Sequence, residues 1–244
     1  MGKCQGSNRL LWRFGVIRVL ETWKSNFTFT LSYGKIKSVK VNVMGECMEK
    51  FEILDAMVER GNGYLLTSDV VKEGISKPTL ASYVRSKPME RVGRGIYFSD
   101  DEWPDELYLL YLQNCRVCFS HETALYLHGL MEREPSRITV TVKAGYNASH
   151  LRKRKIHVYQ VKEEIYNLGV SDTQTTYGNH VAVYDRERTI CDLIKNKENT
   201  DIQVFRNAMK EYMSSGGKNL LNLMNYASKL HAEDEVRKYT EVML

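Results

Sequence analysis

Apolar side chains recur at helical spacing in the segment that follows residue 47. Phe51, Leu54 and Val58, together with Met57, share one face of a helix, so residues 48–60 are predicted to be helical. Gly61, Asn62 and Gly63 then break the pattern. The first element of the folded chain is therefore expected to be an amphipathic helix.

Two short helices are predicted next. Thr67 is a suitable N-cap and Asp69 follows near the positive end of the helix macrodipole, so a helix is expected to run to Lys72. Gly74 ends that helix and Ile75 supplies an apolar anchor in the turn. A second N-cap at Ser76, with Pro78 in the first turn, predicts that another helix begins near Lys77.

The helix that begins near Lys77 has an apolar side and a polar side. Leu80 and Val84 lie on one stripe, with Lys87 close by. Short hydroxyls and an arginine lie roughly opposite: Thr79, Ser82, Arg85 and Ser86. Such a face fits the major groove of DNA, where a helix enters bodily and these side chains reach base edges and phosphates.

A basic hairpin is predicted to follow Pro88. Residues 89–92 and 96–99 have the pattern of two short strands around Gly93, Arg94 and Gly95. Glycines supply the positive φ that a tight turn requires, which leaves Arg94 at the tip and Arg91 on the approaching strand. A hairpin of this kind can enter the minor groove or hold the DNA backbone.

The rest of the chain has helical patterns first, then strand patterns, and helical patterns again at its C-terminal end. Helices are predicted over 101–114, from Ser120 as the N-cap to Gly129, and then over three segments from Arg186 to Leu230. Residues 138–142, 156–161 and 180–184 resemble strands. The predicted fold class is α+β, with an N-terminal winged helix-turn-helix at 48–100 and a mixed α+β domain with a helical C-terminus at 101–244.

Charge is distributed unevenly. The formal net charge of the chain is +5, but residues 1–47 hold eight Lys or Arg against two Glu, which leaves the remainder close to neutral. From Gly74 to Phe98 five basic residues face one acidic residue. The positive charge therefore lies where DNA binding requires it, although a solvated basic surface on an ordinary small helical domain is the structural alternative.

Residues 1–47 are interpreted as a leader, either disordered or upstream of the true start at Met44 or Met48. Arg13 and Arg18 interrupt its apolar stretch, so we expect neither a secretion signal nor a membrane span. Five cysteines, an odd number, favour a reducing compartment, and we predict a cytoplasmic protein.

These patterns define the predicted DNA-binding residues. They comprise the polar side of the helix, its flanking residues and the hairpin: Lys77, Thr79, Ser82, Tyr83, Arg85, Ser86, Lys87, Arg91 and Arg94. A second basic cluster, flanked by His150 and His157, comprises Lys143, Arg152, Lys153, Arg154 and Lys155. It is either a solvated loop or a second nucleic-acid patch.

The sequence favours neither a metal site nor catalysis. Cys115 and Cys118 have the C-x-x-C spacing of a zinc knuckle, and His121 and Cys191 are the other candidate ligands. The sequence has no second C-x-x-C or H-x-x-x-H pair to complete such a site. No P-loop, dinucleotide fingerprint or H-E-x-x-H motif occurs, so no cofactor is predicted. His121 and His128 are interpreted as packing residues.

An acidic group near residue 190 leaves one alternative open. Asp185, Glu187 and Asp192 lie near Arg186 and Arg188, and paired carboxylates with an arginine can hold a metal and a phosphate. Helix capping by Asp185 and pairing of Arg188 with Asp192 explain the same residues more simply. The alternative function is thus a nucleic-acid-acting enzyme with a DNA-binding N-terminus, which requires the three carboxylates to converge in a cleft.

Four segments together carry a family resemblance: GISKPTLASYVRSKPMERVGRGIYF, FSHETALYLHGL, ITVTV and YDRERTICDLI. Over residues 48 to about 229 the chain resembles the AbiEi antitoxins of type IV toxin–antitoxin and abortive-infection systems. The resemblance implies a non-enzymatic winged helix-turn-helix protein that represses its own operon by binding inverted repeats in double-stranded DNA. It also implies a C-terminal domain that counteracts an AbiEii-type nucleotidyltransferase toxin without a stable complex. The long leader departs from the family pattern.

No long apolar heptad supplies an obvious dimer interface. One winged domain contacts only a few base pairs, so an inverted repeat needs two copies. We expect monomers in solution that bind such a repeat in pairs.

Overall fold

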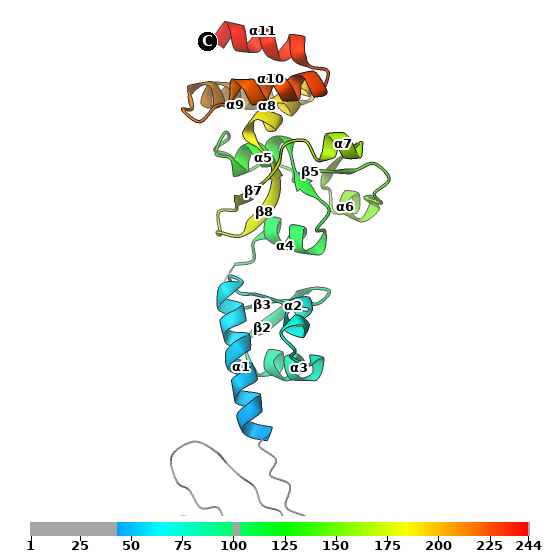
Figure 1. Ribbon diagram of the computed structural model, residues 1–244, viewed down its shortest axis with the longest axis vertical. Coiled ribbons are helices and arrows are strands. Elements are labelled where there is room, and N and C mark those ends of the chain that lie inside the picture. Colours follow the sequence, from blue (N-terminus) through cyan, green and yellow to red (C-terminus); the bar gives the residue numbers. More distant parts are fainter. Residues whose placement is uncertain (1–42, 100–102, 244) are drawn as a thin grey trace, which may run out of the picture. The chain divides into compact units, whose positions relative to one another are not determined.

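The structure is a computed structural model that describes residues 43–99 and 103–243 (Figure 1). Most of the predicted leader therefore lies outside the described residues. The helix that we expected from residue 48 begins earlier, at Val43. Its predicted buried face is confirmed, because Leu54 is fully buried while Phe51, Met57 and Val58 are half-buried.

The elements described between residues 43 and 99 are three helices and the three strands of a small sheet. They are α1 (Val43–Arg60), β1 (Tyr64–Leu66), α2 (Thr67–Lys72), α3 (Lys77–Ser86), β2 (Met89–Gly93) and β3 (Ile96–Ser99). The sheet has the order β1-β3-β2 and both pairings are antiparallel. β1 was not predicted from the sequence.

Local chemistry sets the ends of α2 and α3. Ser76 caps α3, since its side chain accepts a hydrogen bond from the backbone N–H of Thr79, and Pro78 lies in the first turn as predicted. Gly74 has a φ of 77°, which suits the turn between the helices. The predicted cap of α2 is wrong: the N-cap is Leu66, without a side-chain hydrogen bond, and Thr67 is the first helical residue.

The turn of the β2–β3 hairpin is tight. Gly93 pairs with Ile96, so Arg94 and Gly95 form the tip, and the register shifts between Arg91 and Gly93. Only Gly95 has a positive φ, at 73°; the prediction that Gly93 also supplies one is wrong. The bulge in β2 removes that need because it bends the strand into the turn.

The elements after residue 103 begin with α4, whose N-cap is Asp105. They are α4 (Glu106–Gln113), β4 (Cys118–Phe119), α5 (His121–Leu127), β5 (Thr139–Lys143), α6 (Ser149–Lys153), β6 (His157–Val161), α7 (Glu163–Tyr166), β7 (Val170–Gln174), β8 (His180–Tyr184), α8 (Arg186–Lys195), η1 (Lys197–Asn199), α9 (Ile202–Ser214), α10 (Leu220–Lys229) and α11 (Glu233–Met243). Of these, β4, α6, α7, β7, η1 and α11 were not predicted.

A mixed sheet forms the centre of this region. Its order is β6-β5-β4-β8-β7, in which β5–β6 and β4–β8 are parallel and the other pairs antiparallel. One hydrophobic cluster lies on this sheet around Phe119, Val140 and Val183. A second cluster joins α5 to the helices α8 to α11 that follow the sheet (Figure 1). The coarse expectation of an α+β protein with a helical C-terminus is confirmed.

Asp105 links the small sheet to the larger one. Its carboxylate caps α4 at the N–H of Tyr108 and also accepts hydrogen bonds from Thr175 at 2.6 Å and Asn179 at 2.9 Å. The backbone N–H of Asp105 donates to the hydroxyl of Tyr64 in β1. Because Asp105 is buried, these contacts fix the start of α4 against both sheets.

Candidate nucleic-acid interface

The exposed side of α3 carries most of the predicted helix contacts. Lys77, Ser82, Arg85 and Ser86 are exposed, and Thr79 is half-buried. Leu80 and Tyr83, by contrast, are the buried residues of the helix. α3 therefore presents one continuous polar and basic side to solvent.

Hydrogen bonds to the helix backbone hold several of these side chains. The hydroxyl of Ser82 donates to the carbonyl of Pro78 at 3.1 Å, and that of Ser86 donates to Tyr83 at 2.8 Å. Nε of Arg85 donates to the carbonyl of Ala81 at 3.1 Å. Each hydroxyl oxygen keeps a lone pair and the guanidinium keeps further N–H groups, so these side chains retain capacity for contacts with a ligand.

Tyr83 does not belong to the exposed side, which corrects its assignment as a DNA contact. Its side chain is 2% exposed and its hydroxyl donates to the carboxylate of Asp55 in α1 at 2.6 Å. Burial raises the pKa of Tyr83 and the hydrogen bond to Asp55 raises it further. The residue lies three positions after Leu80 and thus continues the buried stripe.

Lys87 is exposed, but its charge is paired. Its ammonium lies 2.9 Å from Oδ1 of Asp55. Although burial raises the pKa of Asp55, hydrogen bonds from Tyr83 and Lys87 outweigh that effect and lower it. The carboxylate neutralises Lys87 locally, so this residue is a weaker candidate for a phosphate contact than the arginines.

The hairpin presents its arginines to solvent. Arg91 is exposed and its Nε donates to the carbonyl of Gly93 at 3.2 Å. Arg94 is exposed at the tip, and no hydrogen bond or ion pair within 43–99 and 103–243 engages its guanidinium. Among the predicted contacts, Arg94 is the one best placed to bind a phosphate.

The second basic cluster is only partly available. Lys143 pairs with Glu163 and lies over the ring of Tyr166, while Arg154 donates to the side chain of Gln113 at 2.7 Å. The remaining members, Arg152, Lys153 and Lys155, are exposed on and after α6. The acidic partner of Lys143, Glu163, directly follows residues 143–162, which contain no Asp or Glu.

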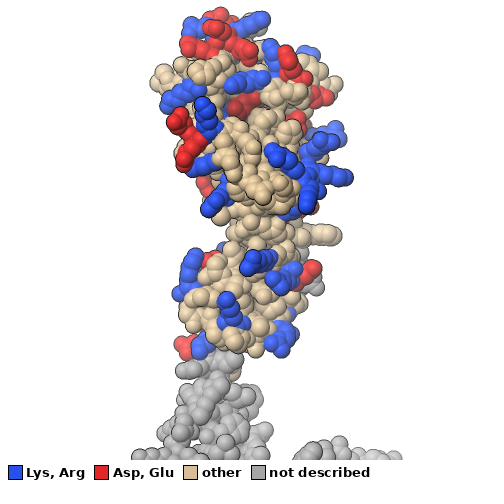
Figure 2. Space-filling view, turned by 90° about the vertical axis from the view of Figure 1, so that its right-hand side faces the viewer, with Lys and Arg blue, Asp and Glu red and all other residues tan. Residues whose placement is uncertain are grey.

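A depression brings this cluster close to the hairpin tip. It has a volume of about 710 Å³, and both Arg94 and Arg154 line it, together with His150 and Asn114. Figure 2 shows one face of the molecule, on which acidic side chains gather mainly around the C-terminal helices and basic ones predominate elsewhere. The structure thus joins two basic groups that are 60 residues apart in the sequence.

The three carboxylates of the enzyme alternative have partners inside the protein. Asp185 caps α8 at the N–H of Arg188 and accepts from the hydroxyl of Tyr226 at 2.8 Å. Glu187 accepts from the hydroxyl of Tyr212 and from the N–H of Asn219. The capping by Asp185 agrees with the structural interpretation of the sequence.

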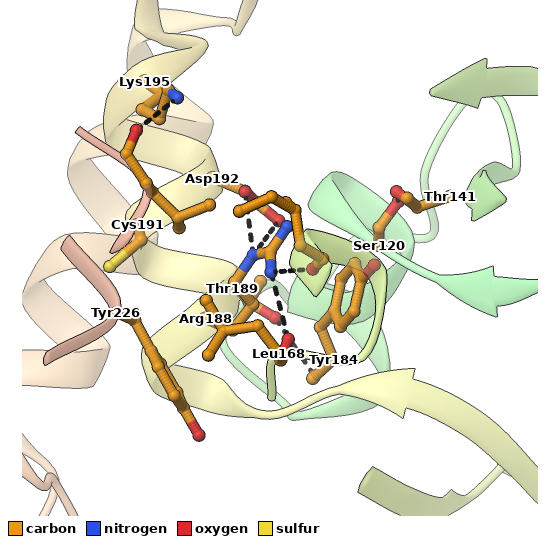
Figure 3. A network of polar contacts seen from close by, with 12 residues as sticks. Ser120, Thr141, Leu168, Tyr184, Arg188, Thr189, Cys191, Asp192, Lys195 and Tyr226 are labelled. Carbon is orange, nitrogen blue, oxygen red and sulfur yellow. Dashed lines mark hydrogen bonds and ion pairs between the residues drawn. The ribbon is translucent and has the colours of Figure 1, made fainter. Parts of the chain in front are cut away.

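Arg188 forms an ion pair with the third carboxylate, that of Asp192. Its Nε lies 3.0 Å from Oδ2 of Asp192, and its Nη1 donates to the carbonyls of Ile165 and Leu168 (Figure 3). The guanidinium lies 4.4 Å from the ring centroid of Tyr184. Arg188 is 2% exposed, so this pairing is a structural one that joins α8 to the segment before β7.

The cysteines and histidines form no metal site in the described ranges, where no three His, Cys, Asp or Glu side chains gather around one point. Cys115 is exposed, whereas Cys118 and Cys191 are buried and donate to backbone carbonyls. Burial raises the pKa of both buried thiols. His128 bonds the carbonyl of Tyr184 at 2.6 Å, which agrees with a packing role.

Comparison with protein-family models found no match, and comparison with curated proteins found none either. Among the helices of the described residues, none has the length and apolar character needed to cross a bilayer.

Proposed function

We propose that residues 48–100 form a winged helix-turn-helix that binds double-stranded DNA, with α3 in the major groove and the β2–β3 hairpin as the wing. The order of elements, α1-β1-α2-α3-β2-β3 with a three-stranded antiparallel sheet, supports the proposal. The observation that carries it is the exposed polar side of α3 followed at once by a hairpin with Arg94 at its tip.

The resemblance to AbiEi antitoxins supplies the biological role in this proposal. The chain represses its own operon at inverted repeats and counteracts an AbiEii-type nucleotidyltransferase toxin in the cytoplasm, without a stable complex and without catalysis of its own. Co-expression with the product of the adjacent reading frame tests this role. Growth arrest by that product, relieved by this chain, supports the antitoxin function, and arrest that the chain leaves unchanged contradicts it.

DNA binding is tested with duplexes from the region upstream of the gene, by fluorescence anisotropy at several salt concentrations. Arg94→Ala is expected to weaken binding, because one phosphate contact is lost. The slope of the logarithm of the binding constant against the logarithm of the salt concentration is expected to become shallower by about one. Lys87→Ala, which removes a lysine already paired with Asp55, is the matched control and is expected to change the slope less. Equal effects of the two variants, or no preference for upstream DNA over unrelated duplexes, would contradict the proposal.

Base readout is a separate prediction. Thr79→Ala and Ser82→Ala are expected to reduce the preference for the operator over a mutated duplex while leaving the salt slope unchanged, because hydroxyls contact base edges without releasing counterions. A competition titration with both duplexes measures the ratio. If the salt dependence of binding changed while the preference for the operator stayed constant, these residues would contact the DNA backbone instead.

A further inference from the structure

The first residue of α5, His121, has an unusual backbone and an unsatisfied side chain. Its φ is 51°, in the left-handed region that few non-glycine residues adopt. Its ring nitrogen Nδ1 is buried and, within the described residues, has no hydrogen-bond partner. Strain combined with an unpaired buried polar atom is costly, and such features concentrate at ligand sites.

Hydrogen bonds between Ser120, which precedes α5, and strand β5 hold this conformation in place. The N–H of Ser120 donates to the carbonyl of Thr139, and the hydroxyl of Thr141 donates to Ser120 Oγ. This also corrects the prediction that the Ser120 side chain caps α5, since it makes no such bond. Burial lowers the pKa of His121, so the ring is neutral near pH 7 and Nδ1 offers one donor or one acceptor.

Three aromatic rings form a stack beside this nitrogen. The rings of His121 and Tyr159 are 3.8 Å apart at 9°, and those of His157 and Tyr159 are 4.7 Å apart at 14°. Asn196 donates to the Tyr159 hydroxyl at 2.8 Å and so fixes the central ring. His157 is exposed, so the stack ends in a ring that solvent can reach.

A cavity of about 390 Å³ opens on this stack. Besides the three rings, amide and hydroxyl side chains line it, including Asn196, Asn199 and Thr200, and Glu122 and Leu193 also belong to its lining. Arg137 and His157 line both this cavity and a neighbouring depression, in which Arg152 and Lys155 add positive charge. The volume falls in the range of small-molecule sites, and the polar lining excludes a purely apolar ligand.

We propose that this cavity binds a nucleotide, with its base against the His157–Tyr159–His121 stack and its phosphate near Arg137. Aromatic faces stack on any base, amides match the donors and acceptors of base edges, and an arginine pairs with a phosphate. The nucleotide is either a free mononucleotide or the end of a single-stranded nucleic acid. The site is distinct from α3 and the hairpin, and it does not depend on operator binding.

The test is isothermal titration of the full chain with the ribonucleoside 5′-monophosphates and with short single strands of the same bases. His157→Ala is expected to weaken binding about tenfold because one stacking surface is lost, while His157→Tyr retains it. His180→Ala, which removes an exposed histidine outside the cavity, is the matched control and leaves binding unchanged. Operator binding is expected to be the same in all three variants.

Arg137→Gln separates the phosphate from the base. This variant is expected to bind nucleotides more weakly, but to bind the corresponding nucleosides, which lack the phosphate, as well as the unmodified chain does. Tighter binding of single strands than of mononucleotides identifies a nucleic-acid end as the natural ligand, and equal affinities identify a free nucleotide. The proposal is overturned if no probe binds saturably up to about 10 mM, or if His157→Ala binds like the unmodified chain.

Discussion

Replacement of Arg188 by methionine is expected to lower the free energy of unfolding by about 3–5 kcal/mol, the largest single effect on stability that we predict. The change leaves Asp192 as a buried carboxylate without its ion pair. It also removes the donor that satisfies the carbonyls of Ile165 and Leu168. Urea unfolding followed by circular dichroism at pH 7 measures the loss.

A matched control exists on α11. Arg237 pairs with Glu233 at the same four-residue spacing and 3.0 Å distance, but both side chains are about half exposed. Arg237→Met is expected to lower the free energy of unfolding by about 0.5 kcal/mol or less, because water screens the ion pair. The double variant Arg188→Met with Asp192→Leu is expected to recover part of the loss, since no unpaired charge remains. If Arg188→Met costs no more than Arg237→Met, the assignment of a structural role to Arg188 is wrong.

Elements that local chemistry determines were predicted well. α3 and the hairpin follow from a cap at Ser76, a proline in the first turn and a glycine at the tip, all of which act within a few residues. The start of α8 follows in the same way from Asp185 and from the spacing of Arg188 and Asp192. In each case the interaction that sets the element lies within its own sequence.

Two of the strands that were not predicted depend on their partners in the sheet. β4 consists of two residues, Cys118 and Phe119, and exists only because β5 and β8 pair with it from either side. β7 is polar along most of its length and is defined by β8. No alternation of apolar and polar residues marks either strand, because β4 has only two residues and β7 is mostly polar.

One candidate site could be predicted from local sequence and the other could not. The polar side of α3 was predicted from helical spacing. The same spacing, three residues after Leu80, indicates that Tyr83 is buried. The nucleotide cavity could not be predicted, because His121 comes from α5 and the other two rings from β6. Only the sheet, through its β4–β5–β6 order, brings these residues together.

The largest functional effect is expected from reversing two charges on the proposed DNA-binding surface. The double variant Arg85→Glu with Arg94→Glu is expected to lower operator affinity by about 100-fold or more, since each glutamate replaces an attraction to a phosphate with a repulsion. Both side chains are exposed, so the fold is expected to be retained. Fluorescence anisotropy with the operator duplex measures the affinity, and circular dichroism checks the fold.

Arg206→Glu with Lys238→Glu provides the control for net charge. Both residues are exposed, on α9 and α11, and their reversal changes the net charge by the same amount. If DNA contacts α3 and the hairpin, this control retains most of the operator affinity, because exposed charges far from the bound DNA are screened within about 10 Å at moderate salt. An equal loss in both double variants would mean that the chain attracts DNA through its overall charge, and α3 would then have no special role.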